Sequence, residues 1–278
     1  MPQAGEALSD QKRAVFFKQS GERLTNRDSA DRWTPAGVRA TGEKIARTYK
    51  VREQLGISGF TVVSGAGNIA RGDELKKHGI GGEQADFLGR LSLVMNTIVV
   101  YQDLCRLRIP AVVLLTEKMK IEDRAADHEA YSATRMREAH AEGQVVLIAG
   151  GTGEDNVTTD NAVVHYANDY RTVDPDQELL ILKGTKHDGV FAHDPEQFTH
   201  AKRFPVISAR TMLAEYERFP VVDRPSLESL VTNNLAMRVY ADGAHDLESV
   251  LRHDPRDGSN GSSIGTLIVP YEYPQAAA

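Results

Sequence analysis

Residues 145–160, VVLIAGGTGEDNVTTD, constrain the fold of this chain more than any other segment. The apolar run predicts a buried strand at 145–149, and Gly150 and Gly151 end it abruptly. Because glycine has no Cβ, the backbone at such a strand end can approach a ligand closely. The Thr-Thr-Asp triplet at 158–160 is typical of a helix start, where free N–H groups attract phosphate. We therefore expect a strand, a glycine-rich loop and a helix that together can bind an anion.

Two further strands are expected to end at glycines in the same way. Residues 13–19 predict a buried strand that the Ser-Gly pair at 20–21 interrupts, and residues 60–63 predict another that ends at the SGAG segment 64–67. Lys18 lies at the end of the first strand, where a buried ammonium group is costly unless it faces an anion. The alternative is that its side chain extends into solvent.

Two charged side chains close to these breaks can serve phosphate binding. Arg71 follows the second break with a forked guanidinium that suits phosphate oxygens, although this break can equally be a plain turn. Asp160 can cap its own helix, or it can lie opposite Lys18 and hold that lysine in place. The three breaks together favour the binding of phosphate over three unrelated turns.

A further predicted strand at 179–183 brings two more cations to the same edge of the sheet. Lys183 ends this strand and Lys186 follows it, while residues 188–189, Asp-Gly, predict a turn. The loop at 64–72 does not have the GxGxxG spacing of dinucleotide-binding folds, and the chain contains no GxxxxGK[ST] Walker loop. The expected phosphate site is therefore of another kind.

Strands and helices alternate along most of the chain, which predicts a mostly parallel sheet with helices on both faces. The fold class is α/β, a three-layer αβα sandwich, and ligands in such sheets bind beyond the carboxyl ends of the strands. Besides those already named, strands are expected at 111–115, 237–240 and 265–269, and helices at 35–54, 85–108, 127–142, 159–168, 225–236 and 244–252.

Composition excludes several classes of protein. The 278 residues carry a net charge of −6, and no basic stripe indicates nucleic acid as a partner. No apolar run approaches the roughly 18 residues of a membrane span, and residues 1–13 lack the apolar core of a signal peptide, so we expect a cytoplasmic protein. The single cysteine, Cys105, lies in an apolar helical pattern and is expected in the core. No histidine spacing indicates a metal site.

The ordered set of motifs resembles the amino-acid kinase superfamily and, within it, the bacterial-type UMP kinases (uridylate kinases). The resemblance covers nearly all of residues 13–269. It is carried by FKQSGE at 17–22, SGAGNIARG at 64–72, ADFLGRLSLVMN at 85–96, AGGTGEDNVTTD at 149–160, LKGTKHDGVFAHDP at 182–195, RVY at 238–240 and GTLI at 265–268.

The resemblance implies an enzyme that transfers a phosphoryl group from ATP, with Mg²⁺, to UMP in pyrimidine nucleotide synthesis. It implies catalytic roles for Lys18, Asp160 and Lys186, with Asp160 orienting the catalytic lysine. ATP would be bound by Lys18, Ser20, Gly21, Gly67, Arg71, Thr185, Phe191 and Asp194. UMP would be bound by Ala66, Asp86, Thr152, Gly153, Thr158 and Thr159.

The resemblance also implies an organisation of the chain. A kinase domain would span 13–270, with the acceptor-binding part at about 13–170 and the ATP-binding part at about 171–270, between an N-terminal extension at 1–12 and a tail at 271–278. The predicted helix at 85–108 would serve a subunit interface in a homo-oligomer, for which a hexamer is favoured.

One loop departs from the family pattern. Where the family usually reads GTGNPFFTTD, this chain reads GTGEDNVTTD, which removes stacking surface and adds Glu154 and Asp155 close to an anionic nucleotide. Like charges weaken binding unless a cation intervenes. Two alternatives therefore stay open: a kinase of the same fold with another acceptor, and a non-catalytic nucleotide-binding storage or regulatory protein.

Overall fold

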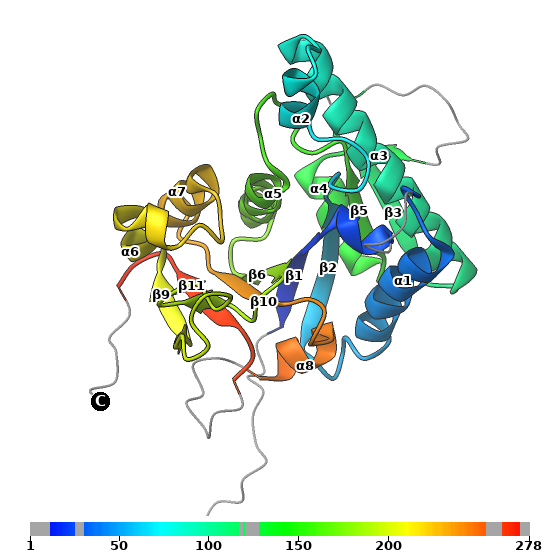
Figure 1. Ribbon diagram of the computed structural model, residues 1–278. Coiled ribbons are helices and arrows are strands. Elements are labelled where there is room, and N and C mark those ends of the chain that lie inside the picture. Colours follow the sequence, from blue (N-terminus) through cyan, green and yellow to red (C-terminus); the bar gives the residue numbers. More distant parts are fainter. Residues whose placement is uncertain (1–11, 26–30, 117–118, 120–127, 254–262, 273–278) are drawn as a thin grey trace, which may run out of the picture.

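The computed structural model describes residues 12–25, 31–116, 119, 128–253 and 263–272 (Figure 1). Among these residues nine strands form one sheet, in which β11 is antiparallel to β10 and the other neighbours are parallel. In spatial order the strands are β4 (Glu129–Ala130), β3 (Ala111–Leu115), β5 (Val145–Ala149), β2 (Ile57–Ser64), β1 (Arg13–Gln19), β6 (Glu178–Thr185), β10 (Met237–Ala241), β11 (Thr266–Val269) and β9 (Val206–Ser208).

Helices cover both faces of this sheet, so the predicted three-layer αβα sandwich is confirmed (Figure 1). Consecutive residues of a strand point to opposite faces, and Phe16 and Phe17 of β1 accordingly belong to two separate cores. One core is closed by α4 (Ala133–Ala141), α5 (Thr159–Val173), α6 (Ala209–Ala214) and α7 (Arg224–Thr232). The other is closed by α1 (Pro35–Lys50), α3 (Gly82–Arg106) and α8 (Leu247–Arg252).

Short elements complete the described chain. The turn η1 (Gly21–Leu24) follows β1, α2 (Gly72–Lys77) precedes α3, and η3 (Tyr216–Arg218) precedes α7. A two-stranded antiparallel ribbon forms from β7 (Val190–Phe191) and β8 (Arg203–Phe204). Neither α2 nor α6 was predicted, because at six residues each they show too little periodicity to read from sequence.

Several sequence expectations differ from the structure, among them two helix ends: α1 stops at Lys50 rather than at 54, and α5 continues to Val173 rather than to 168. The helix predicted at 127–142 begins only at Ala133, because Ser132 caps it by accepting a hydrogen bond from Arg135 N at 3.0 Å. The long helix α3 stops short of 108, where Arg108 has a left-handed φ of 57°. Cys105 is exposed rather than buried in the core.

Three segments that the sequence analysis named lie mostly outside the described residues. Most of the N-terminal extension (1–11), of the loop at 254–263 (254–262) and of the tail (273–278) falls outside the description. Within the described ranges, no helix combines the length and apolar character that crossing a bilayer requires.

A buried histidine predicts an acid-sensitive fold. His140 of α4 is 5% exposed, its Nε2 lies 2.9 Å from Thr61 Oγ1, and burial lowers the pKa of its imidazole to about 3 from an ordinary 6.5. As the pH falls, His140 therefore takes up a proton in the unfolded chain before it does so in the folded chain. The stability that His140 contributes is complete above pH 6.5 and is lost as the pH falls toward 3. At pH 5 the loss from this residue is about 2 kcal/mol.

Urea unfolding at pH 7 and pH 5 tests this expectation. Between pH 7 and pH 5 the free energy of unfolding of the parent protein should fall by about 2 kcal/mol more than that of His140→Gln, which keeps a partner for Thr61 but does not titrate. His78→Asn, a change at an exposed histidine, should follow the parent. Equal losses in the parent and in His140→Gln would contradict the assignment.

Candidate active site

Two glycine loops meet at the carboxyl ends of the adjacent parallel strands β1 and β2. Gly65 N donates a hydrogen bond to Gln19 O at 2.8 Å, which brings the end of one strand against the other. A Cβ atom on Gly21 would lie 2.4 Å from Gly65 O and 2.6 Å from Asn68 Oδ1, so no side chain fits there. The backbone at both strand ends is thus held bare and close, as the glycine pattern predicted.

A buried asparagine of α3 holds these loops in place. Asn96 Nδ2 donates to Gly65 O and to Asn68 Oδ1, both at 2.7 Å, while its Oδ1 accepts from Trp33 Nε1 at 2.8 Å. The side chain is fully buried. Sequence analysis assigned it no role, although a lone amide inside an apolar helix demands buried partners and is itself a signal.

A carboxylate between two lysines lies beside the loops. Asp160, in the first turn of α5, is 3.5 Å from Lys18 Nζ and also pairs with Lys183, whose Nζ donates to Val221 O at 2.6 Å. Lys18 and Lys183 are register partners on β1 and β6, so their side chains leave the sheet on the same face. The expected juxtaposition of Asp160 and Lys18 is therefore present, and it includes Lys183, which was predicted only as a further cation at this edge of the sheet.

The electrostatics of this cluster keep the carboxylate charged. Burial works to raise the pKa of Asp160, but the positive charges of Lys18 and Lys183 outweigh it and leave that pKa below its ordinary value. Burial lowers the pKa of Lys183 in spite of the attraction of Asp160. An ionised Asp160 can accordingly orient the Lys18 ammonium, which is the more exposed of the two lysines.

Thr158 caps the helix that begins beside Asp160, and its side chain also contacts the cap residue of α7. Thr158 accepts a hydrogen bond from Asn161 N at 3.1 Å, as the N-cap of α5, and donates one to Asp223 Oδ2 at 2.6 Å. Asp223 is in turn the N-cap of α7 and accepts from Ser226 N at 2.8 Å. Sequence analysis missed Asp223, because only the tertiary fold brings residue 223 to residue 158.

The two glycine loops, Lys18, Asp160 and the two cap residues Thr158 and Asp223 line one cavity of about 460 Å³, while Lys183 and Asn96 support these groups from behind the lining. Ten of the sequence-predicted site residues line it: Lys18, Ser20, Gly21, Ala66, Gly67, Arg71, Asp86, Thr158, Thr159 and Asp160. Lining residues that were not predicted include Arg90, Leu93 and Asp223.

The remaining predicted residues do not line this cavity. Lys186 is exposed and pairs with Glu196, and Thr185 donates to His187 O at 2.7 Å within the same turn. Phe191 lies half-buried on β7, and Asp194 accepts from Glu196 N at 2.9 Å. Thr152 and Gly153 shape the turn after β5. The assignment of these residues to nucleotide binding stays a prediction.

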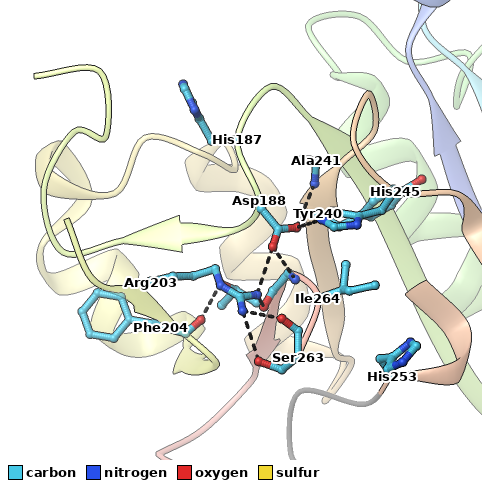
Figure 2. Close-up of polar contacts among 12 residues, drawn as sticks. His187, Asp188, Arg203, Phe204, Tyr240, Ala241, His245, His253, Ser263 and Ile264 are labelled. Carbon is cyan, nitrogen blue, oxygen red and sulfur yellow. Dashed lines mark hydrogen bonds and ion pairs between the residues drawn. The ribbon is translucent and has the colours of Figure 1, made fainter. Parts of the chain in front are cut away.

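Asp188 fixes the turn after β6, close to Thr185 and Lys186 in the sequence (Figure 2). It accepts hydrogen bonds from Ala241 N and Gly265 N, each at 3.2 Å, and it lies 3.3 Å from Arg203 Nη1 and 3.4 Å from His245 Nε2. Asp188 thereby ties the segment after β6 to the ends of β10 and β11. The predicted turn is confirmed, and its aspartate has a structural role that the sequence did not reveal.

Comparison with known proteins decides which family the fold and this cavity belong to. The model of the amino acid kinase family matches residues 20–239. The chain belongs to the amino acid kinase family. Its curated relatives place it with the uridylate kinases of that family.

Three of these relatives span most of the chain. The uridylate kinase of Protochlamydia amoebophila is 29% identical over 258 residues, 93% of this chain and 95% of that protein. That of Roseobacter denitrificans is 31% identical over 227 residues, 82% and 86% of the two chains. That of Bradyrhizobium sp. (strain ORS 278) is 34% identical over 196 residues, 69% and 74% of the two chains.

Solved structures agree on the amino acid kinase fold. A UMP kinase from Ureaplasma parvum superposes with a TM-score of 0.75 at 22% identity, covering 93% of this chain and 99% of that one. An aspartate kinase from Synechocystis superposes with a TM-score of 0.63 at 16% identity, covering 95% of this chain and 41% of that one. The superpositions establish the fold, and the acceptor must be argued from the site.

Proposed function

We propose that this protein is a UMP kinase that transfers the γ-phosphoryl group of ATP to UMP, giving UDP and ADP. The observation that carries the proposal is the Lys18–Asp160–Lys183 cluster, of which Lys18 and Asp160 line the same cavity as the glycine loops while Lys183 pairs with Asp160 behind them. The cavity combines cationic groups with glycine backbone that a phosphate can approach closely, and phosphoryl transfer uses both.

In the proposed reaction an oxygen of the UMP phosphate attacks the γ-phosphorus of ATP. The bond from that phosphorus to the bridging β,γ oxygen breaks, and ADP leaves with the electron pair. The acceptor oxygen is already ionised near neutral pH, so the site needs no general base. Lys18 would neutralise the charge that spreads over the moving group, while Asp160 holds Lys18 and the loop at Gly21 fixes the phosphates.

Mg²⁺ would enter this site as part of MgATP and would shield the charge of the β- and γ-phosphates. The cavity fits that arrangement, because carboxylates line its wall together with the glycine loops. Mg²⁺ commonly relies on substrate phosphates and water with only one or two protein carboxylates. Asp73 is a carboxylate on the cavity wall that would serve this purpose, whereas Asp223 already accepts hydrogen bonds from Thr158 and Ser226.

Two further features are part of the proposal. Helix α3 exposes Phe87, Leu88 and Met95, an apolar surface that supports its expected use as a subunit interface in a homo-oligomer such as a hexamer. A cytoplasmic site of action is consistent with the substrates that we propose.

An assay of ADP release with MgATP across a panel of acceptors tests the function. We expect turnover with UMP, and values of kcat/KM lower by at least about tenfold for CMP and by much more for carbamate and glutamate. Turnover with carbamate or glutamate but not with UMP would favour another kinase of the same fold. The absence of ADP release with every acceptor would favour a non-catalytic nucleotide-binding protein.

A further inference from the structure

One face of α3 forms a wall of the cavity. Asp86, Gly89, Arg90 and Leu93 all line it, and their spacing of three, four and seven residues places them on one side of a helix. The family pattern assigns a role only to Asp86. Arg90, one turn further along, is the larger polar group on this wall, with 18% of its side chain exposed.

Arg90 lies along α3 at a distance from the glycine loops, where the phosphates of the nucleotides would bind. Asn96, on the same helix, holds Gly65 of the second glycine loop. Arg90 precedes Asn96 by six residues, which at the rise of an α-helix is about 9 Å along the axis. With a phosphate at the glycine loops, that distance brings Arg90 to the nucleoside end of the acceptor.

The altered loop contacts this same wall. Arg90 Nη1 lies 2.5 Å from Asp155 Oδ1, and Lys76 Nζ lies 2.9 Å from Asp86 Oδ1 and 2.7 Å from Asn156 Oδ1. The loop at 154–157 is thus fastened to α3 and α2 by cations. Asp155, which was expected to repel an anionic nucleotide, is neutralised by Arg90.

The ion pair leaves part of the guanidinium unused. Arg90 Nε is buried and has no hydrogen-bond partner within the described residues. A guanidinium only donates hydrogen bonds, and an unpaired buried donor is unfavourable until an oxygen or another acceptor atom reaches it. The exocyclic amino group of a pyrimidine cannot satisfy this donor, because its nitrogen lone pair is delocalised into the ring and the group only donates hydrogen bonds.

We propose that Arg90, held by Asp155, recognises the 4-keto oxygen of the acceptor base, the position at which cytosine carries an amino group, and so selects uracil over cytosine. The inference rests on the proposed function and deepens it, since it names the residue that distinguishes uracil from cytosine. Arg90 acts on the choice of acceptor and not on the transfer step. Its removal therefore changes the preference between nucleotides more than kcat for UMP.

Calorimetric titration with UMP and with CMP, in the absence of ATP, tests the proposal. The parent protein should bind UMP at least about tenfold more tightly than CMP, and Arg90→Met should bring the two affinities within about twofold by weakening UMP. Asp155→Asn, which loosens the hold on Arg90, should give an intermediate ratio. Arg106→Met, at the far and exposed end of the same helix, should keep the parent ratio.

Two results would overturn the proposal: no preference for UMP in the parent, or an unchanged ratio in Arg90→Met. If the ratio is unchanged because both nucleotides bind equally more weakly, Arg90 belongs to the shared phosphate. Should Arg90→Met fail to fold, Arg90→Lys keeps the charge without the fork and should lose the preference as well. Because the titration needs no turnover, its failure is distinct from failure of the kinase function, which would appear as no UDP formed from UMP and MgATP by the parent.

Discussion

Replacing Lys18 with alanine is expected to lower kcat with UMP and MgATP by about a thousandfold while the protein stays folded. The Lys18 side chain is 17% exposed and lines the cavity, so it can reach a bound phosphoryl group. Removing one preorganised group that stabilises charge in a transition state typically costs two to three orders of magnitude, ~10²–10³ in kcat. The fold should tolerate the change because Asp160 keeps its pair with Lys183.

Steady-state kinetics measure the expected loss of kcat, and a thermal melt tests whether the variant stays folded. Lys50→Ala, at the exposed C-terminal end of α1, is the matched control and should retain the parent kcat. Lys186→Ala belongs in the same series, because Lys186 must leave Glu196 to reach a phosphate and its loss should cost less than that of Lys18. A folded Lys18→Ala protein with the kcat of the parent would remove Lys18 from the mechanism.

The elements that sequence analysis located correctly are those whose signal is local. The run at 145–149 and the strand at 13–19 are short, apolar and bounded by glycine, and the structure reproduces both ranges. The glycine loops follow directly, since the steric demand at Gly21 is set by backbone that lies immediately after the strands. The pairing of Lys18 with Asp160 was predictable because the carboxyl ends of parallel strands share an edge.

The contacts that sequence analysis missed depend on register and on distant capping. Whether Lys183 or Lys186 reaches Asp160 depends on how β6 pairs with β1, and the register that places Lys183 beside Lys18 is set by packing across the whole sheet. Arg90 was read as one more residue of a long helix. Only the fold of the loop at 154–157 gives it a partner in Asp155 and a place on the cavity wall.

Replacing Lys183 with methionine is expected to destabilise the fold by about 3 kcal/mol and to lower kcat by about tenfold. Methionine fills a similar volume, so the change removes charge and hydrogen bonds more than packing. Asp160 is left with only Lys18, at 3.5 Å, and Val221 O loses a buried donor. Without the Lys183 charge the pKa of Asp160 should rise, so activity should fall at a higher pH on the acid side.

A double-mutant cycle in urea separates this pairing from a general loss of packing. Asp160→Asn should cost markedly less stability in the Lys183→Met background than in the parent, with a coupling energy of about 1–3 kcal/mol, because the second change removes a carboxylate that has already lost its partner. The urea m-value should stay constant across the four proteins. Additive losses of stability, or an unchanged acid side of the pH–activity profile in Lys183→Met, would mean that Lys183 only fills space beneath the site. Coupling together with a shifted acid side of that profile would make Lys183 the group that positions Asp160 and, through Asp160, the ammonium of Lys18.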